Sequence, residues 1–306
     1  MPKSYPLPDH ALRITTYAQL QGYATAFAAK KLGLLFLLGR PGTGKSRAVS
    51  EAVGDDCCWI CGNASPFGIY MSAYEHRNQL LILDDVDGLY RDRTGLRLLK
   101  SLCQSDPLKR VAWHTDAATL DRRGVPREFT TTSHVAIIAN QWKSLSEDVA
   151  ALEDRGHVIH FDPRPLEIHK QAASWYWDQE VFDFVAANLH LIEDHSLRTY
   201  FRTWELKSAG LDWRAAVLSS FLSGKALEVA KLRADPSFDS EEARARAFVQ
   251  AGHGCRATYY SHAKRFSQTA KTPQFTLTAT SPPKPRESSE GLSELLRRRY
   301  GKLGNG

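Results

Sequence analysis

One stretch constrains the fold of this chain more than any other. Residues 39–46, Gly-Arg-Pro-Gly-Thr-Gly-Lys-Ser, match the pattern G-x-x-x-x-G-K-[ST]. The stretch follows the apolar run Leu34–Leu38, which is typical of a strand buried on both faces, and precedes a helix expected to continue through Val53. In that setting, backbone N–H groups of a glycine-rich loop close around phosphates, and the helix start adds its positive end. The alternative is an ordinary glycine-rich turn, which the strand–loop–helix context disfavours.

The motif assigns roles to individual side chains. Lys45 is expected to reach the β- and γ-phosphates of a nucleotide, and the Ser46 hydroxyl to ligate Mg²⁺. The residues expected to bind the cofactor are Gly39, Pro41, Gly42, Thr43, Gly44, Lys45, Ser46 and Arg47.

Further apolar runs predict a parallel sheet. Strands are expected at Cys57–Cys61, Leu80–Leu83, Val135–Ala139 and His157–Phe161, with helices between them and a first helix over residues 11–31. Strands that alternate with helices favour an α/β, three-layer fold with helices on both faces of the sheet. Residues 106–133 are extra material and predict an inserted hairpin or loop.

Polar residues end two of these strands. Asp84 and Asp85 follow the Leu80–Leu83 run, and Asn140 follows Val135–Ala139. Asp84 is expected to hold the metal together with Ser46, and Asp85 to orient the attacking water, with Asp87 as its less favoured substitute. Asn140 is expected to hydrogen-bond that water or the γ-phosphate; the alternative is a turn-starting asparagine.

The second half has a different character. Residues 165–234 are helical in pattern and rich in tryptophan, which predicts a small helical domain with an aromatic core. Two helices are expected within residues 240–266. Gly254–Tyr260 resembles the turn and recognition helix of a helix-turn-helix, and the alternative is a plain helical hairpin. Residues 267–291 are rich in Ser, Thr and Pro and predict disorder.

Charge is concentrated at the C-terminal end. From Lys264 onward there are nine Lys and Arg and three Glu, which accounts for the whole formal net charge of +6. A basic tail suggests a contact with DNA, although solvated charge is the commoner explanation.

No apolar run approaches the ~20 residues of a membrane span. The N-terminus lacks the apolar core of a secretory signal, so a cytoplasmic location without membrane contact is expected.

Five cysteines are present, three of them in the run Cys57–Cys61. A structural zinc site needs four ligands at suitable spacing, so free strand cysteines are the favoured interpretation.

These motifs together resemble those of the AAA+ ATPases. The resemblance covers residues 14–234 approximately and rests on GRPGTGKS, LLILDD, the strand ending at Asn140, and ALEDR (residues 151–155). It implies a P-loop core (1–164), a helical lid (165–234), and ATP with Mg²⁺ bound between subunits of a homo-oligomer. The remaining segments are then a helical extension (235–266) and a basic, disordered tail (267–306).

The resemblance also implies two catalytic arginines. Arg155 matches the position of an arginine finger that projects into the neighbouring subunit; the alternative is a helix C-terminus with Gly156 as its cap. Arg198 matches a lid arginine that touches the γ-phosphate, presented by a helix that Ser196 could cap, with Arg202 as its rival.

One departure concerns the branch of the family. Many AAA+ proteins have Asp-Glu where this chain has Asp84-Asp85. The double aspartate resembles replication-initiator, helicase-loader and transposition-helper ATPases, including phage and mobile-element types, whereas the 106–133 insert resembles a hairpin of other branches.

The expected function is ATP hydrolysis that remodels or loads a nucleic-acid or protein complex. The alternative is a nucleotide-switched adaptor with negligible turnover. The protein target is left open.

Overall fold

The computed structural model describes residues 7–86, 89, 92–114, 118–140, 152, 154–191, 195–222, 224–267 and 274–281. An α/β domain is built on a six-stranded sheet in which all neighbouring strands are parallel, in the order β1-β8-β2-β7-β4-β3. The strands are β1 (Leu12–Ile14), β2 (Leu34–Leu38), β3 (Cys57–Cys61), β4 (Leu80–Asp84), β7 (Val135–Ala139) and β8 (His157–Phe161). The expected parallel sheet is confirmed, and β1 is an addition to it.

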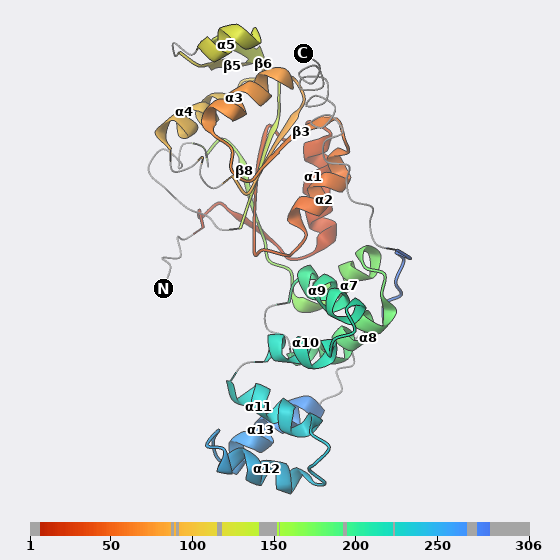
Figure 1. Cartoon of the computed structure of the whole chain (residues 1–306). Helices are drawn as coiled ribbons and strands as arrows, with labels where there is room; N and C mark the ends of the chain where they lie inside the picture. Colours follow the sequence, from red (N-terminus) through yellow and green to blue (C-terminus); the bar gives the residue numbers. More distant parts are fainter. Residues whose placement is uncertain are drawn as a thin grey trace, which may run out of the picture.

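Helices cover both faces of this sheet (Figure 1). Alternate residues of β2 point to opposite faces, so Leu35 joins one apolar core and Phe36 the other. The first core includes residues of α1 (Tyr17–Ala28) and α2 (Lys45–Val53). The second includes residues of α3 (Pro66–Glu75) and α4 (Arg93–Leu102). The three-layer arrangement is therefore as expected.

The helix expected over residues 11–31 begins only at Tyr17. Thr16 accepts a hydrogen bond from the backbone N–H of Gln19, and the Gln19 side chain accepts one from the backbone N–H of Thr16. This capping box fixes the start of α1. The preceding residues Leu12–Ile14 instead pair with β8 as an edge strand.

The extra material before β7 forms the expected hairpin. β5 (Lys109–Ala112) pairs antiparallel with β6 (Glu128–Thr131), and α5 (Ala118–Arg123) lies between them in the chain. Trp113, just after β5, packs on Tyr70 of α3. The hairpin lies at the end of the core away from the later helices (Figure 1).

The helices predicted to form the lid, called the lid below, follow β8 and lie below the core in Figure 1. Its elements are α7 (Pro165–Trp175), α8 (Gln179–Asn188), the 3₁₀ turn η2 (Leu189–Leu191), α9 (Leu197–Ser208) and α10 (Trp213–Phe221).

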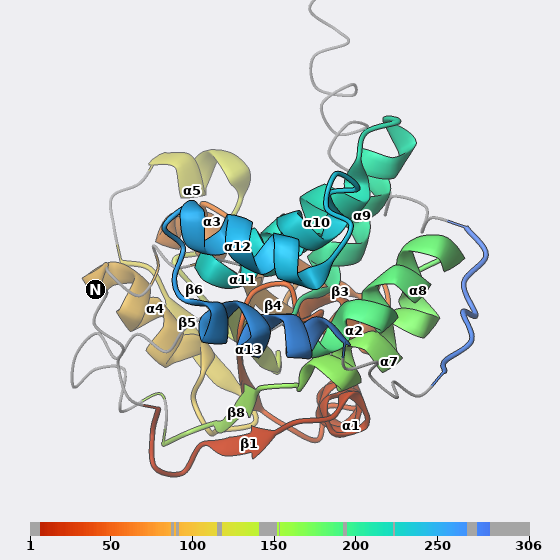
Figure 2. The same ribbon diagram turned by 90° about the horizontal axis from the view of Figure 1, so that it is seen from below.

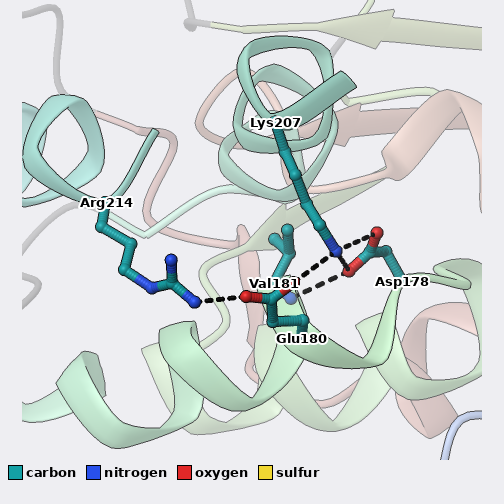
Figure 3. A network of polar contacts seen from close by, with 5 residues as sticks. All are labelled: Asp178, Glu180, Val181, Lys207 and Arg214. Carbon is teal, nitrogen blue, oxygen red and sulfur yellow. Dashed lines mark hydrogen bonds and ion pairs between the residues drawn. The ribbon is translucent and has the colours of Figure 1, made fainter. Parts of the chain in front are cut away.

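Charged side chains link three of these helices (Figure 3). Lys207 of α9 lies 2.8 Å from carboxylate oxygens of both Asp178 and Glu180 at the start of α8, and Arg214 of α10 also binds Glu180. Asp178 accepts a further hydrogen bond from the backbone N–H of Val181. Although burial opposes it, these bonds lower the pKa of Asp178. The network therefore fixes how α8, α9 and α10 are arranged.

A further three-helix unit lies beyond the lid. It comprises α11 (Gly224–Ala234), α12 (Glu241–Gln250) and α13 (Arg256–Ser267). One apolar cluster joins the three helices; it consists of Val229, Ala245, Phe248, Tyr259 and Ala263. Figure 2 shows these helices in front of the rest of the molecule. Packing thus groups α11 with α12 and α13, whereas the domain boundary predicted from the sequence falls after residue 234.

Residues 274–281 run as an extended segment beside the lid (Figure 1). The backbone N–H of Thr278 donates to the carbonyl of Ala173 in α7, and Phe275 and Leu277 pack on the core that α7 shares with α1. This segment of the tail, in which disorder is predicted, therefore contacts α7, because its alternating apolar residues find a surface there. The other residues of the expected tail beyond Ser267 lie outside the described residues. None of the described helices is long and apolar enough to cross a bilayer.

Candidate functional site

The loop between β2 and α2 requires its glycines. Gly42 and Gly44 have positive φ angles of 76° and 80°, a conformation that side chains disfavour. A Cβ at Gly39 would lie 2.2 Å from the carbonyl oxygen of Phe161, and one at Gly44 would lie 2.5 Å from the ring of Trp175. The motif therefore lies on a strand–loop–helix turn, as the sequence indicates.

Two hydroxyl groups brace this loop from inside. Thr43 is fully buried, and its hydroxyl donates to the carbonyl of Arg40 at 2.9 Å. The hydroxyl of Tyr17, at the start of α1, donates to the carbonyl of Thr43 at 2.7 Å. The loop is thus held in shape by the core, which suits a site that must bind without rearranging.

Lys45 turns back across the loop. Its ammonium group donates to the carbonyls of Gly39 at 2.7 Å and Arg40 at 2.9 Å, and to the side-chain oxygen of Asn140 at 3.3 Å. Burial lowers the pKa of Lys45 to about 8, although the carboxylates of Asp85 and Asp84 oppose the shift. The ammonium group of Lys45 therefore lies at the loop, within reach of Asn140.

The carboxylates predicted from the sequence reach the same place. The Ser46 hydroxyl donates to Asp84 at 3.0 Å, and the Asn140 amide donates to Asp85 at 2.9 Å. Burial raises the pKa of Asp84, against the hydrogen bond from Ser46. Asp85 has a positive φ of 52°, an uncommon conformation outside glycine that is a feature of many functional sites. Asp87, its predicted substitute, lies outside the described residues.

This arrangement follows from the order of the strands. β7 lies between β2 and β4, so Asn140 stands between the loop after β2 and the two aspartates at the end of β4. In open parallel sheets, ligands bind beyond the carboxyl ends of the strands. Three segments far apart in the sequence are therefore brought together at one edge of the sheet.

The lid contacts the same loop. The backbone N–H of Leu197 donates to the carbonyl of Gly42 at 2.8 Å. A Cβ at Gly42 would lie 2.9 Å from the Cβ of Ser196 and 3.4 Å from the Cδ of Arg198. Both Arg198 and its rival Arg202 are exposed, but it is Arg198 whose side chain lies beside Gly42 of the loop. Ser196 stands at the N-cap position of α9, but its side chain makes no capping hydrogen bond, which corrects the predicted role.

Trp175 is a neighbour of the loop that the sequence reasoning did not single out. Besides its contact with Gly44, its ring lies under the guanidinium of Arg47 at 4.6 Å, and its indole N–H donates to Glu51 at 3.2 Å. Arg47, predicted to bind cofactor, also pairs with Glu51. The signal in the sequence is the richness in aromatic residues, and it predicts the core of a helical domain rather than a contact with the loop.

A cavity of about 600 Å³ adjoins this group between α1, α2 and α7. Tyr17, Ala48 and Trp175 supply apolar walls, and Gln21 and Gln171 are among its polar lining residues. The charged side chains of Glu167 and Lys170 line it as well.

Arg155 lies at the opposite edge of the sheet. It precedes β8, whose first residue pairs with Leu35 of β2, and the phosphate-loop motif begins only after Leu38. Five strand residues at about 3.3 Å each separate the edges by roughly 17 Å. Arg155 is exposed, and its guanidinium donates to the carbonyl of Lys100 at 3.1 Å. The structure does not bring it to the loop of its own chain.

The helix-cap interpretation of this corner requires Gly156 in a left-handed conformation. Gly156 is not among the residues with positive φ. It is instead required by close packing, because a Cβ there would lie 2.7 Å from Leu34. The helix expected before Arg155 lies outside the described residues except for Leu152.

Comparison with known proteins gives distant matches. No protein-family model matches the chain. An uncharacterised 36.7 kDa protein from the nrdC–mobD intergenic region of enterobacteria phage T4 is 29% identical over 115 residues, and the match covers 35% of this chain and 35% of that protein. The chain thus spans about a third of the length of this curated relative.

Solved structures also match over most of the chain. NtrX from Brucella abortus, crystallised in complex with ATP, aligns with 85% of this chain and 70% of its own, at 12% identity and a TM-score of 0.42. The DNA clamp loader delta protein of Bacillus subtilis aligns with 81% of this chain and 88% of its own, at 10% identity and a TM-score of 0.30. Matches this distant carry no assignment of function, which must come from the side chains of this chain.

Proposed function

We propose that the chain is a Mg²⁺-dependent ATP hydrolase of the AAA+ type, active as a homo-oligomer. One observation carries the proposal. Lys45, the Ser46–Asp84 pair and the Asp85–Asn140 pair converge on one braced glycine loop, and Arg198 of the lid stands over it. Phosphoryl transfer to water needs a phosphate-binding loop, oxygen ligands for the metal, a carboxylate that orients the water, and a cationic side chain such as an arginine.

The residues present fit a hard divalent cation. The Ser46 hydroxyl and Asp84 carboxylate lie 3.0 Å apart, and oxygen ligands of this kind suit Mg²⁺. Bound there, Mg²⁺ would neutralise charge on the β- and γ-phosphates. The ammonium group of Lys45 would give up its hydrogen bonds to the loop carbonyls and donate to phosphate oxygens instead. Asp85, oriented by Asn140, would accept a proton from the attacking water, and Arg198 would stabilise charge on the transferred group.

The cavity beside Trp175 suits the base of the nucleotide. It adjoins α2, whose first turn would face the α-phosphate side of the loop, and its aromatic walls could stack on a purine. Gln21 and Gln171 offer both donors and acceptors to the edge of the base. ATP would then bridge the core and the lid.

Replacement of Lys45 by alanine tests this proposal. We expect ATP affinity measured by calorimetry to fall at least about a hundredfold, because two hydrogen bonds to charged groups are worth about 3 kcal/mol or more. The melting temperature should stay near that of the wild type, since the variant removes a buried charge.

Lys31→Ala is the matched control, because Lys31 is an exposed lysine of the same domain. Its ATP affinity should match the wild type. An unchanged affinity in Lys45→Ala would sink the assignment of the phosphate loop.

A nucleotide-switched adaptor with negligible turnover is the second candidate. It is favoured by one observation: the water-orienting group is the short Asp85, already engaged by Asn140. A turnover assay with and without DNA separates an adaptor from an ATPase that remodels its target.

We further propose that the C-terminal region binds DNA through phosphates. In the three-helix unit, α12 and α13 are joined by residues 251–255, but Arg256 and Tyr260 of α13 both bind Glu242. These side chains are therefore engaged within the unit, and the basic tail is the better candidate for phosphate contacts.

Deletion of residues 282–306 tests this role without cutting α13 or the 274–281 segment. It removes six Lys and Arg and three Glu. We expect DNA affinity to fall, and the slope of log affinity against log salt to become shallower by about 0.9 for each phosphate that the tail neutralises in the full-length protein. Equal affinity and slope for the full-length and shortened proteins would refute the proposal.

A further inference from the structure

A second cavity, of about 420 Å³, opens at the amino-terminal edge of the sheet, away from the phosphate loop. It lies between the starts of β2, β7 and β8 and the loop that leads from α4 to β5. Four basic side chains line it: Lys109, His134, Arg155 and His157. One acid, the exposed Asp106, is also in the lining.

Lys109 is the unusual member of this group. It is 4% exposed, and the partner of its ammonium group is the carbonyl oxygen of Ser133. A buried charge is normally paired with an opposite charge. In the described part of the chain, none of the four basic residues forms an ion pair with a carboxylate.

Two further observations describe how the basic side chains of this cavity are arranged. Lys109 and Arg155 both act on the buried thiol of Cys103, whose pKa burial raises to about 12 while the two cations oppose the shift. His134 holds the carbonyl of Leu32 at 2.8 Å through Nδ1. Because a carbonyl only accepts, the Nδ1–H of His134 is the donor in this bond. The bond fixes the orientation of the ring, and Nε2 remains for a second partner.

We propose that this cavity is a second anion site, which binds a terminal phosphate group through Lys109 and Arg155. A guanidinium matches the geometry of phosphate oxygens, and a buried ammonium adds a point charge in a medium where screening is weak. The volume leaves room for a phosphate group with part of its water shell. Two sources present the same chemistry: free polyphosphate in solution, and the terminal phosphate of a nucleotide held by a second copy of this chain.

The first arm of the test uses the Lys45→Ala protein, so that the phosphate loop is disabled, with inorganic pyrophosphate in the absence of divalent metal. We expect saturable shifts of the His134 and His157 imidazole signals in NMR spectra. Adding Lys109→Met should weaken binding about tenfold or more, as for loss of a charge-assisted hydrogen bond. This arm does not depend on the ATPase proposal.

Arg110→Met is the matched control. Arg110 is the next residue of β5, is exposed, and pairs with Glu128 outside the cavity. The Arg110→Met variant changes the net charge by the same amount as Lys109→Met. It should alter the affinity for pyrophosphate less than about twofold, since screening weakens exposed charges. Arg155→Met serves as a second cavity variant if Lys109→Met does not fold.

The second arm adds wild-type copies loaded with a non-hydrolysable ATP analogue, and it rests on the proposed function. If pyrophosphate has no effect but the loaded copies shift the same imidazole signals, the phosphate comes from a neighbouring subunit. If neither addition shifts them, or if Arg110→Met weakens binding as much as Lys109→Met, the anion site is overturned.

Discussion

The Arg155→Ala protein is expected to bind ATP, to melt near the wild-type temperature and to hydrolyse ATP about 10³–10⁵ times more slowly. Arg155 stands at the edge of the sheet opposite its own phosphate loop, so it can act on a nucleotide only across a subunit interface. A loss of that size corresponds to about 4–7 kcal/mol of barrier. The hydrogen bond to Lys100 is exposed and is worth only about 1 kcal/mol of stability. Turnover and thermal melting therefore separate a catalytic from a structural role.

A mixture of Arg155→Ala and Lys45→Ala tests the action in trans. Each variant alone should be inactive. In mixed oligomers, Lys45→Ala subunits supply an intact Arg155 to neighbours whose phosphate loops are intact, and some hydrolysis should return. Arg155→Lys is a further control, because an ammonium does not reproduce the planar fork of a guanidinium. A mixture that stays inactive despite verified co-assembly would remove the main support for the finger, and normal turnover by Arg155→Ala alone would exclude it.

Asp85→Asn should bind ATP as tightly as the wild type and hydrolyse it about 10²–10⁴ times more slowly, the usual worth of general acid–base catalysis. The substitution is clean on structural grounds. Asparagine tolerates the positive φ of 52° at this position, and its side-chain oxygen can still accept from Asn140. Asp84 and Ser46 are left in place for the metal. Single-turnover assays with saturating ATP measure the chemical step directly.

Asp85→Glu is the companion variant. If the short side chain limits the positioning of water, the added methylene should raise turnover. The strained backbone opposes this gain, because glutamate favours a left-handed conformation less than aspartate does, at a cost of about 1 kcal/mol. Wild-type turnover by Asp85→Asn would mean that another group, such as Asp87, takes the proton.

The sequence was sufficient for those parts of the site that depend on local pattern. A continuous apolar run predicts a buried strand, and in a parallel sheet the residues after such strands share one edge. This pattern alone predicts that Lys45, Asp84 and Asn140 lie together. Their hydrogen bonds now link all three strand ends.

The missing parts depend on tertiary contacts. β1 is three residues long and mostly exposed, so its apolar pattern is too short to distinguish it from the start of a helix. Trp175 reaches the loop only because the lid folds back on Gly44, which no local pattern encodes. Residues 274–281 have the composition of a disordered tail, and their contacts with α7 depend on a surface that Phe275 and Leu277 can cover.

The main-chain bond between Leu197 and Gly42 has a thermodynamic consequence. It couples the orientation of the lid to the shape of the loop, so a ligand that favours one lid position must change the affinity of the loop for phosphate. Such coupling is reciprocal. If nucleotide changes the affinity of a partner for the lid by some factor, that partner changes the affinity for nucleotide by the same factor. A coupling of 1–3 kcal/mol, typical of such linkage, is about a 5- to 150-fold effect in both directions. The response of nucleotide affinity to each candidate partner thus measures that partner's preference for the nucleotide-bound state.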